Sequence, residues 1–241
     1  MNILITMAGD GSRFRKIGFS SPKHMIEVKG RSLFSWSLSS FENFFENDFV
    51  FITRAEHKTI PFIEKECAEL GIQRFGCLEL SAPTAGQAET AMLAQRLIQR
   101  PNEPIIIYNI DTYVEPAALR PEMIRGDGWV PVFEAQGERW SFCSFDETGL
   151  VNGIAEKRRI SNYATIGLYY FKSFELFSDC YHSYDFGGYP ERFVAPMYEV
   201  LLRDGKRRVY SDVIAQSAVH VLGTPEDVRE FYPAFSVPKT P

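Results

Sequence analysis

The segment Ile3-Leu4-Ile5-Thr6-Met7-Ala8-Gly9-Asp10-Gly11-Ser12-Arg13 decides the fold. Its first six residues form a short apolar run, and the glycines that follow end that run abruptly. A short apolar run of this kind is typical of a strand that is buried on both faces, as in a parallel sheet. The sequence therefore predicts a central strand followed by a glycine-rich loop.

Strand-like and helical patterns alternate along the first half of the chain. Two more short apolar runs, residues 49–53 and 104–108, have the character of the first strand. Helical spacing covers residues 32–44, 60–70 and 86–99, and Pro61 and Gly71 mark the two ends of the second of these. Strands that alternate with helices over residues 1–112 predict βαβ units with right-handed crossovers.

The second half is richer in strand-like patterns. These cover residues 129–145, 154–158 and 163–171, and residues 193–203 are helix-like. No internal repeat, low-complexity tract or linker rich in Pro and Gly separates the halves. We therefore expect one α/β domain over residues 1–241, whose second half completes the sheet and walls one side of a pocket; two independent domains are the alternative.

Composition and charge exclude several classes of function. The 241 residues are 45% hydrophobic and 24% charged, which indicates a folded rather than a disordered chain. A net charge of −5 argues against a general nucleic-acid-binding surface but allows a local basic pocket. The four cysteines lack zinc-binding spacing, no run approaches 18 apolar residues, and nothing resembles a signal peptide. We expect a soluble, cytoplasmic protein without a membrane span.

The loop after the first strand carries cations that suit an anionic ligand. Glycines let backbone N–H groups approach an anion closely, because no Cβ intervenes. Arg13 provides a planar fork for two phosphate oxygens, and Lys23 provides a compact charge. The loop is neither a Walker A motif nor a Rossmann fingerprint, since Phe14 stands where the third Rossmann glycine belongs. On these residues alone, a tight turn with a solvated Arg and Lys is an alternative.

Gly9-Asp10-Gly11-Ser12-Arg13, followed by Pro22-Lys23, resembles the N-terminal signature of the sugar-phosphate nucleotidyltransferases: a strand, G-x-G-[ST]-R, and then P-K. The resemblance implies a three-layer α/β/α fold with a mixed, mostly parallel central sheet, Rossmann-like and of the GT-A type. It implies that a loop wraps the triphosphate of an NTP, and this loop consists of Ala8, Gly9, Asp10, Gly11 and Ser12. Arg13 would hold the departing β- and γ-phosphates and Lys23 would lie at the α-phosphate, which makes both candidate catalytic residues.

The segment Thr84-Ala85-Gly86-Gln87-Ala88 opens a helix and resembles the turn that faces the nucleobase in that family. The resemblance adds Thr84, Gly86 and Gln87 to the nucleotide-binding residues. The Gln87 amide can pair both its donor and its acceptor with the edge of a base. The alternative is an ordinary helix cap by Thr84 or a neighbour.

The segment Tyr108-Asn109-Ile110-Asp111 closes a strongly apolar strand. Asn109 is a further nucleotide-binding candidate, and Asp111 matches the magnesium-binding Asp of the family. The carboxyl end of a buried strand is where ligand sites of α/β proteins form. Mg²⁺ uses one or two carboxylates together with phosphate oxygens. The alternative is an Asp that only caps the loop.

Residues 153–171 resemble the block of the family whose Glu and Lys line the pocket for the acceptor sugar phosphate. The resemblance assigns sugar-phosphate binding to Glu156, Lys157, Asn162 and Glu191, although an adjacent Glu and Lys taken alone are most simply a surface pair. With residues 193–198 and 222–228, the ordered matches cover roughly residues 2–231 and indicate the branch associated with capsule and lipopolysaccharide synthesis.

One position departs from the family pattern. Much of the wider superfamily has a second magnesium-binding Asp two residues before the Gly of the G-T-P-E-D block, and Val221 occupies that position here. Asp212 is the nearest upstream acid and is one candidate for the missing ligand. His220 is the other, although Mg²⁺ prefers oxygen ligands.

The resemblance implies an Mg²⁺-dependent transfer of NMP from an NTP to a sugar phosphate or polyol phosphate, with release of pyrophosphate. The acceptor phosphate is largely a dianion at neutral pH, so it needs no general base. A glycosyltransferase and a non-catalytic nucleotide-sugar-binding protein are the alternatives. The base, the acceptor and the oligomeric state, monomer or homo-oligomer, are left open. We expect no nucleic-acid partner.

Overall fold

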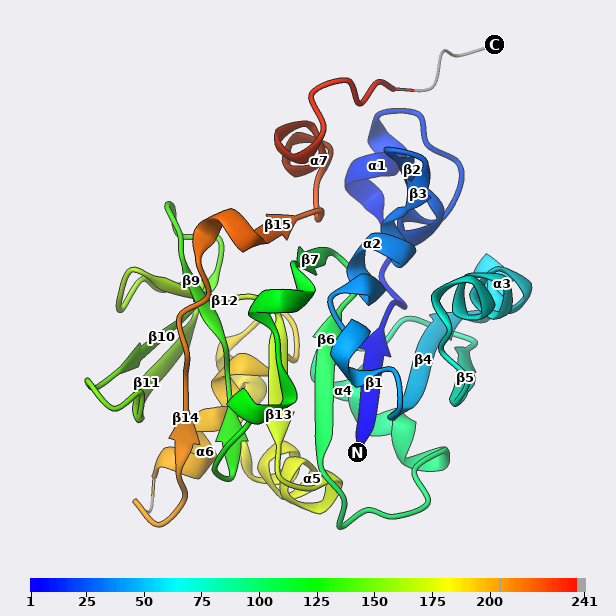
Figure 1. Cartoon of the computed structure of the whole chain (residues 1–241). Coiled ribbons are helices and arrows are strands. Elements are labelled where there is room, and N and C mark those ends of the chain that lie inside the picture. Colours follow the sequence, from blue (N-terminus) through cyan, green and yellow to red (C-terminus); the bar gives the residue numbers. More distant parts are fainter. Residues whose placement is uncertain (204, 238–241) are drawn as a thin grey trace.

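A seven-stranded sheet forms the centre of the chain (Figure 1). The computed structural model describes residues 1–203 and 205–237. In spatial order the strands are β14 (Val209–Tyr210), β8 (Gly128–Trp129), β13 (Leu168–Phe171), β6 (Ile105–Asn109), β1 (Asn2–Thr6), β4 (Asp48–Arg54) and β5 (Phe75–Leu80). Strand β13 runs antiparallel to both of its neighbours, and every other pair in this sheet is parallel. The predicted mixed, mostly parallel sheet is confirmed.

Strand β1 shows why both faces of the sheet must be covered. Ile3 and Ile5 belong to one hydrophobic cluster, whereas Leu4 belongs to another. All three side chains are fully buried. Successive side chains of a strand point to opposite faces, so a continuous apolar run requires packing on both sides.

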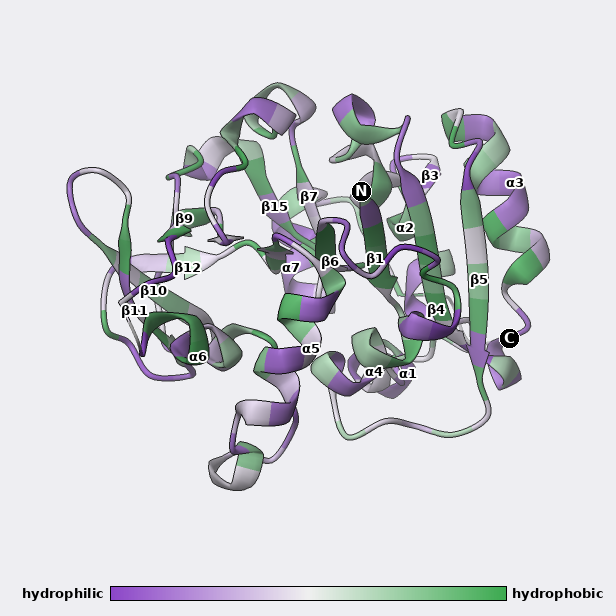
Figure 2. Ribbon diagram, turned by 90° about the horizontal axis from the view of Figure 1, so that it is seen from below, coloured by the Kyte–Doolittle hydropathy of each residue, from purple (hydrophilic) through white to green (hydrophobic). Residues whose placement is uncertain are grey.

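Helices cover each face of the sheet and complete three layers. On one face, α2 (Leu33–Ser39) and α3 (Ile60–Leu70) pack with the cluster that contains Ile3. On the other, α4 (Gln87–Leu93), α5 (Phe174–Ser183) and α6 (Tyr198–Leu202) pack with the cluster that contains Leu4. Figure 2 shows apolar colouring along β1 and β6 and mixed colouring along α3, as expected for buried strands and a helix with one exposed face. The predicted layer arrangement is confirmed.

Three of the predicted helices are shorter in the structure. The segment 32–44 ends its α-helix at Ser39 and continues as a 3₁₀ turn at Glu42–Phe44. Helix α4 likewise gives way to a 3₁₀ turn at Ala94–Arg96, and a turn at Ala195–Met197 precedes α6. In α2 the Ser39 hydroxyl donates to the Ser35 carbonyl 2.8 Å away, a local bond that competes with continuation of the helix. Helix α3 has the predicted bounds, and Gly71 ends it in the left-handed conformation.

The second half builds a separate antiparallel sheet beside the central one (Figure 1). Its strands, in order, are β11 (Val151–Glu156), β10 (Ser141–Phe145), β12 (Tyr163–Thr165) and β9 (Val132–Glu134). The predicted strand-like range 163–171 therefore divides between two sheets, β12 in this one and β13 in the central one. The break falls at Gly167, whose φ of 79° is readily adopted only by glycine.

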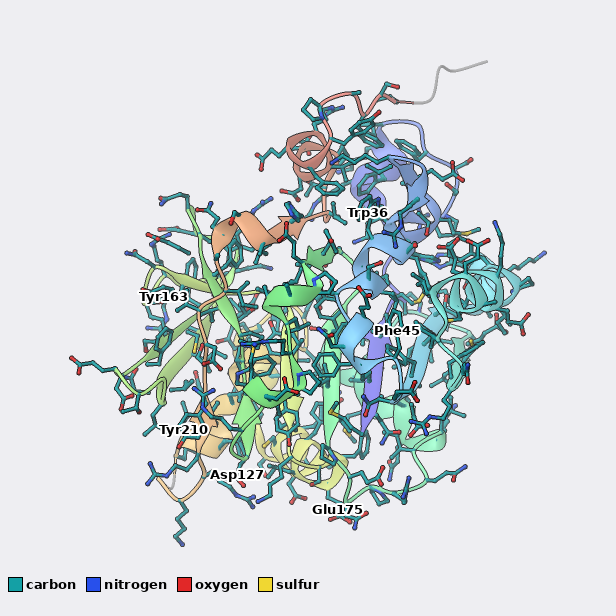
Figure 3. The ribbon with its side chains drawn as sticks, viewed as in Figure 1. Trp36, Phe45, Asp127, Tyr163, Glu175 and Tyr210 are labelled. Atoms are coloured by element: carbon teal, nitrogen blue, oxygen red, sulfur yellow. The ribbon has the colours of Figure 1, made fainter. Side chains whose placement is uncertain are left out.

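A small cap lies over the carboxyl ends of the parallel strands. It contains α1 (Ser12–Lys16), the hairpin of β2 (Glu27–Val28) and β3 (Arg31–Ser32), the pair of β7 (Thr112–Val114) and β15 (Val219–Val221), and α7 (Pro225–Phe231). Trp36, labelled in Figure 3, packs 5.2 Å from the Tyr113 ring and 5.0 Å from the Phe231 ring. Helix α7 thus packs against α2. None of the helices in the described residues is long and apolar enough to cross a membrane.

The order of the strands reverses direction beside β1. From β1 the chain moves outward to β4 and β5, and it then returns to place β6 on the other side of β1. Ligands of open α/β sheets bind at the carboxyl ends of the strands where the order reverses in this way. Thr6 and Asn109 are paired at this point, at the ends of β1 and β6.

Candidate active site

A cavity of about 830 Å³ opens at the carboxyl ends of β1 and β6. Its walls come from the glycine-rich loop, the start of α4, the end of β6, the antiparallel sheet and the cap. Thirteen residues singled out in the sequence line it: Ala8, Gly9, Asp10, Gly11, Arg13, Lys23, Thr84, Gly86, Gln87, Asn109, Asp111, Glu156 and Glu191. We call this space the central cavity.

The glycine-rich loop approaches Lys23 closely. Gly11 has a φ of 61°, and a Cβ built on it would lie 3.3 Å from the Cβ of Lys23. Glycine therefore provides both the left-handed conformation and the room for this approach. Arg13 lines the central cavity with an exposed side chain, whereas Ser12 is not among the lining residues.

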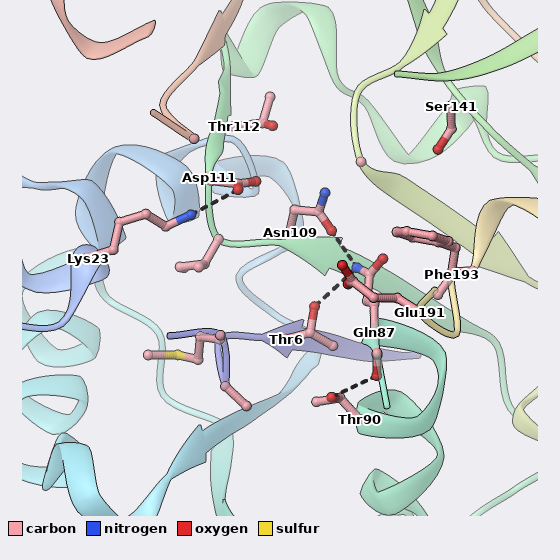
Figure 4. Close-up of a pocket in the computed structure, with 18 of the residues that line it drawn as sticks. Thr6, Lys23, Gln87, Thr90, Asn109, Asp111, Thr112, Ser141, Glu191 and Phe193 are labelled. Atoms are coloured by element: carbon pink, nitrogen blue, oxygen red, sulfur yellow. Dashed lines mark hydrogen bonds and ion pairs between the residues drawn. The ribbon is translucent and has the colours of Figure 1, made fainter. Parts of the chain in front are cut away.

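Lys23 and Asp111 form an ion pair in the cavity, drawn in Figure 4. The Lys23 Nζ donates to Asp111 Oδ2 at 2.9 Å, and the side chains are 16% and 32% exposed. Asp111 follows β6, and its backbone carbonyl accepts a hydrogen bond from the Leu222 N–H of the cap. A partly exposed carboxylate that already attracts a cation at a strand end can also bind a metal ion.

Two arginines that the sequence did not single out anchor the loop through Asp10. The Arg15 guanidinium donates to the Asp10 carbonyl at 2.5 and 2.8 Å. Arg54, at the end of β4, places Nη1 3.5 Å from an Asp10 carboxylate oxygen. Arg15 lies in α1, directly after the loop, whereas Arg54 comes from β4 and meets Asp10 only in the folded chain.

His24 lies buried beside Lys23 and also lines the central cavity. Burial, and to a smaller extent the charges of His57 and Lys23, lower the pKa of His24 to about 3. The side chain is therefore neutral at neutral pH. Its Nε2 has no hydrogen-bond partner within residues 1–203 and 205–237.

Gln87 is the first residue of α4 and points into the cavity. Its amide nitrogen donates to the Thr6 hydroxyl at 3.1 Å and to the side-chain oxygen of Asn109. Both amide hydrogens are thus used inside the protein, and the amide oxygen is the part of this side-chain group left to pair with a base. The alternative of a Thr84 cap is wrong, because Gly86 holds the N-cap position and no side chain caps it.

The backbone before α4 pairs with the segment that carries Glu191. Arg192 N–H donates to the Ala85 carbonyl at 2.7 Å, and its carbonyl accepts from Ala88 N–H at 2.9 Å. A Cβ on Gly86, whose φ is 146°, would lie 2.5 Å from the Arg192 nitrogen. Glycine at position 86 is therefore required for this close pairing, which brings Glu191 next to Gln87 in the cavity wall.

The acceptor-side candidates divide into two groups. Glu156 lines the cavity and accepts a hydrogen bond from the Ser141 hydroxyl, while burial raises the pKa of its carboxyl. Lys157 and Asn162 are not among the lining residues: the Lys157 ammonium lies 4.6 Å from the centre of the Phe193 ring, and Asn162 accepts from Arg159. The structure thus brings Glu156 and Glu191 to the cavity, but not Lys157 or Asn162.

Neither candidate for a second metal ligand reaches the central cavity. Asp212 accepts from Arg125 at 2.6 Å and from the Trp129 indole at 2.7 Å. His220 stacks on the Tyr113 ring, 5.4 Å between centroids. Both are absent from the cavity wall.

The structure instead places Asp227 of α7 near Asp111. A Cβ on Gly223 would lie 3.3 Å from Asp111 Oδ2 and 3.6 Å from Asp227 Oδ2. Asp227 is 4% exposed, and Arg139 donates to its Oδ1 at 2.5 Å from the loop between β9 and β10. Asp227 belongs to the quoted G-T-P-E-D block, but only the fold of the cap shows that its carboxylate turns toward the cavity.

Known structures resemble this chain over nearly its whole length. A nucleoside-diphosphate-sugar pyrophosphorylase from Vibrio cholerae RC9 is 32% identical, with a TM-score of 0.88 over 96% of this chain and 99% of that one. The chain belongs to the sugar-phosphate nucleotidyltransferase family. No family model matches it, and neither does any curated protein.

More distant members show the same fold. The inositol-1-phosphate CTP transferase from T. maritima is 19% identical, with a TM-score of 0.74 over 94% of this chain and 90% of that one. A UDP-glucose pyrophosphorylase is 17% identical, with a TM-score of 0.74 over 95% of both chains. At these identities the likeness concerns the fold, which is the nucleotidyltransferase α/β fold.

Proposed function

We propose that this chain transfers NMP from an NTP to a sugar phosphate or polyol phosphate, with release of pyrophosphate. The single observation that carries the proposal is the convergence of Arg13, Lys23 and Asp111 on one cavity that residues of both halves enclose. We assign residues 1–112 to the nucleotide and residues 113–241 to the acceptor. The pyrophosphorylase from Vibrio cholerae, which matches along nearly its whole length, supports the reaction class.

The charges of the cavity wall show what the substrates must add. Five carboxylates and three cations line it, and two of the cations, Lys23 and Arg139, already pair with two of the carboxylates. Binding of two phosphorylated substrates beside these carboxylates would be electrostatically unfavourable unless positive charge enters with the substrates. We therefore propose that the nucleotide binds as its complex with Mg²⁺.

The residues present fit such an ion. Asp111 presents a hard oxygen ligand to the cavity, and Mg²⁺ commonly takes one or two carboxylates with phosphate oxygens in the remaining positions. The described residues contain no cluster of three or more metal-ligating side chains, so most ligands would come from the nucleotide and water. Bound there, Mg²⁺ would supply positive charge to the transferring phosphoryl group.

The protein's own groups provide alignment and charge. Asp111 engaged by a cation would release the Lys23 ammonium, which could then bind the α-phosphate, while Arg13 binds the phosphates that depart. The phosphate of the acceptor attacks the α-phosphorus of the NTP, and the bond between the α-phosphorus and the departing pyrophosphate breaks. The attack needs no general base, because the acceptor phosphate is largely dianionic at neutral pH. Holding two anions in line contributes by proximity, and the fixed cations stabilise the developing charge.

The test is a pyrophosphate-release assay with the four NTPs against a panel of sugar and polyol phosphates, each with Mg²⁺ and with excess EDTA. We expect one NTP and acceptor pair to give turnover that EDTA abolishes. Full activity in EDTA would contradict the metal assignment. Tight nucleotide binding without turnover over the whole panel would instead favour a non-catalytic nucleotide-sugar-binding protein.

We further propose that the product serves capsule or lipopolysaccharide synthesis in the cytoplasm. Support comes from the ordered sequence matches over roughly residues 2–231, including residues 193–198 and 222–228, which together resemble that branch of the family. Deletion of the gene should then remove one of these surface polysaccharides, and the polysaccharide profile of the deletion strain provides the measurement.

A further inference from the structure

Three polar side chains meet at the centre of the cavity floor: Thr6 at the end of β1, Asn109 at the end of β6, and Gln87 at the start of α4 (Figure 4). Their hydrogen bonds form one chain. The Thr6 hydroxyl donates to the Tyr108 carbonyl at 3.2 Å and accepts from Gln87 Nε2 at 3.1 Å. Gln87 Nε2 also donates to Asn109 Oδ1.

This series of hydrogen bonds determines which end of the Gln87 amide faces the protein. The Thr6 hydroxyl has a single hydrogen, which the Tyr108 carbonyl receives, so toward Gln87 the hydroxyl can only accept. The group of Gln87 beside it must therefore be the NH₂ and not the oxygen. The second hydrogen of that NH₂ then requires an acceptor, and Asn109 must present Oδ1 to it. If only one of the two amides, Gln87 or Asn109, were flipped, a hydrogen bond would be lost or two donors or two acceptors would face each other.

The backbone around these residues holds them in place. Thr6 and Asn109 face each other in the parallel register of β1 and β6. At Gly167, a Cβ would lie 2.5 Å from Asn109 Nδ2, so only glycine leaves room for that amide. The pairing of residues 85 and 88 with Arg192 fixes the start of α4, and with it Gln87.

We propose that Thr6 and Asn109 are positioning residues that lock Gln87 as a hydrogen-bond acceptor, so that the ligand group at the cavity floor must be a donor. Of the side-chain polar atoms of Gln87, Oε1 is the one that these bonds leave for a ligand. Glu191 lies beside Gln87 in the cavity wall, and Glu156 lines the same cavity; both carboxylates also accept when ionised. This inference rests on the proposed function and narrows its substrates to those that offer an N–H of a base or a hydroxyl of the sugar or polyol at this point.

Thr6→Val removes the hydroxyl and frees both amides to turn together, which would offer the ligand an NH₂ instead of an oxygen. Asn109→Ala removes the other acceptor. Thr53→Val is the matched control: Thr53 is also a strand threonine, it is fully buried and outside the cavity wall, and its hydroxyl bonds Thr59 at 2.8 Å, away from Gln87. All four proteins, wild type included, are compared by calorimetric dissociation constants, so the readout does not depend on turnover.

Two sets of ligands distinguish the source of the donor. The first compares each NTP with a counterpart that lacks a donor on the base: 3-methyl-UTP, N4,N4-dimethyl-CTP, N6,N6-dimethyl-ATP and 1-methyl-GTP. The second compares glucose 1-phosphate and myo-inositol 1-phosphate with their singly deoxygenated forms. Loss of the donor leaves the Gln87 oxygen unpaired, so we expect wild type to bind the intact ligand at least about tenfold more tightly in one set.

In Thr6→Val and Asn109→Ala this discrimination should fall by at least about threefold, whereas Thr53→Val should keep it. A Thr6→Val protein that binds its ligands and discriminates between intact and donor-free ligands like wild type would contradict the proposed role of Thr6. So would a wild-type protein that binds and does not discriminate in either set. If wild type binds none of the NTPs and sugar phosphates, the proposed function itself fails, which is a separate result.

Discussion

The ammonium group of Lys23 lies 2.9 Å from Oδ2 of Asp111, although 87 residues separate them in the chain. Each of the two residues neutralises the other in the absence of substrate. Lys23→Ala and Asp111→Asn should each lower kcat/KM for pyrophosphate release at least about 10²-fold, the size typical of removing one electrostatic stabiliser. Steady-state kinetics provide the measurement, with circular dichroism to show that both variants fold.

Lys65→Ala is the control for these variants. Lys65 lies on α3 in an exposed pair with Glu69, 3.6 Å apart, and it is not among the residues of the cavity. Its replacement should leave turnover within about twofold of wild type. Near-wild-type turnover in Lys23→Ala or Asp111→Asn would remove that residue from the site.

The contact between Gly86 and Arg192 predicts unequal costs for two glycine replacements. A Cβ at Gly86 would meet the Arg192 backbone at 2.5 Å, whereas a Cβ at Gly137, whose φ is 79°, meets nothing within 4 Å. Gly137→Ala should cost about 1 kcal/mol of unfolding free energy, because only the conformation is strained. Gly86→Ala should cost about 3 kcal/mol or more, because the backbone must also move. Equal urea midpoints for the two variants would contradict this account of position 86.

Burial of His24 predicts a loss of stability in acid. The folded pKa of about 3 lies below the value near 6.5 expected for an unfolded histidine, so between these values only the unfolded state takes up the proton. The contribution of neutral His24 to the free energy of unfolding is therefore fully present above pH 6.5 and is lost as the pH falls toward 3. His24→Gln should flatten this dependence in urea unfolding at pH 7, 5.5 and 4.5. Exposed His182 provides the control, and the prediction fails if His24→Gln keeps the wild-type slope.

The ion pair of Arg139 and Asp227 joins the antiparallel sheet to the cap. Arg139→Ala should destabilise the protein by about 2 kcal/mol, because it leaves a buried carboxylate without its cation, an effect reduced by the half-exposed position of Arg139. Asp227→Asn removes that uncompensated charge, so the double variant should be more stable than Arg139→Ala alone. Thermal unfolding of the four proteins measures the coupling, and additive effects of the two changes would exclude it.

Much of the central sheet could be predicted because β1, β4 and β6 are buried on both faces and therefore read as apolar runs. β5 was missed because Phe75 and Glu79 are exposed, which hides the strand pattern. The division of residues 163–171 between two sheets depends on Gly167 and on partners distant in sequence. Arg13, Lys23 and Asp111 could be assigned to one pocket from the sequence, because they stand in short motifs that follow one another in a fixed order. The restriction of Gln87 to an acceptor could not, because it depends on the strand register that sets Thr6 opposite Asn109.

The antiparallel strand β13 has a consequence for any attempt to separate the two halves. It pairs with four of the five residues of β6, from Leu168 opposite Tyr108 to Phe171 opposite Ile105. A fragment that ended at residue 112 would leave one side of β6 as an open, flat and strongly apolar edge, which is a template for aggregation. We expect such a fragment to form particles detectable by light scattering, and co-expression with the remainder of the chain to suppress them.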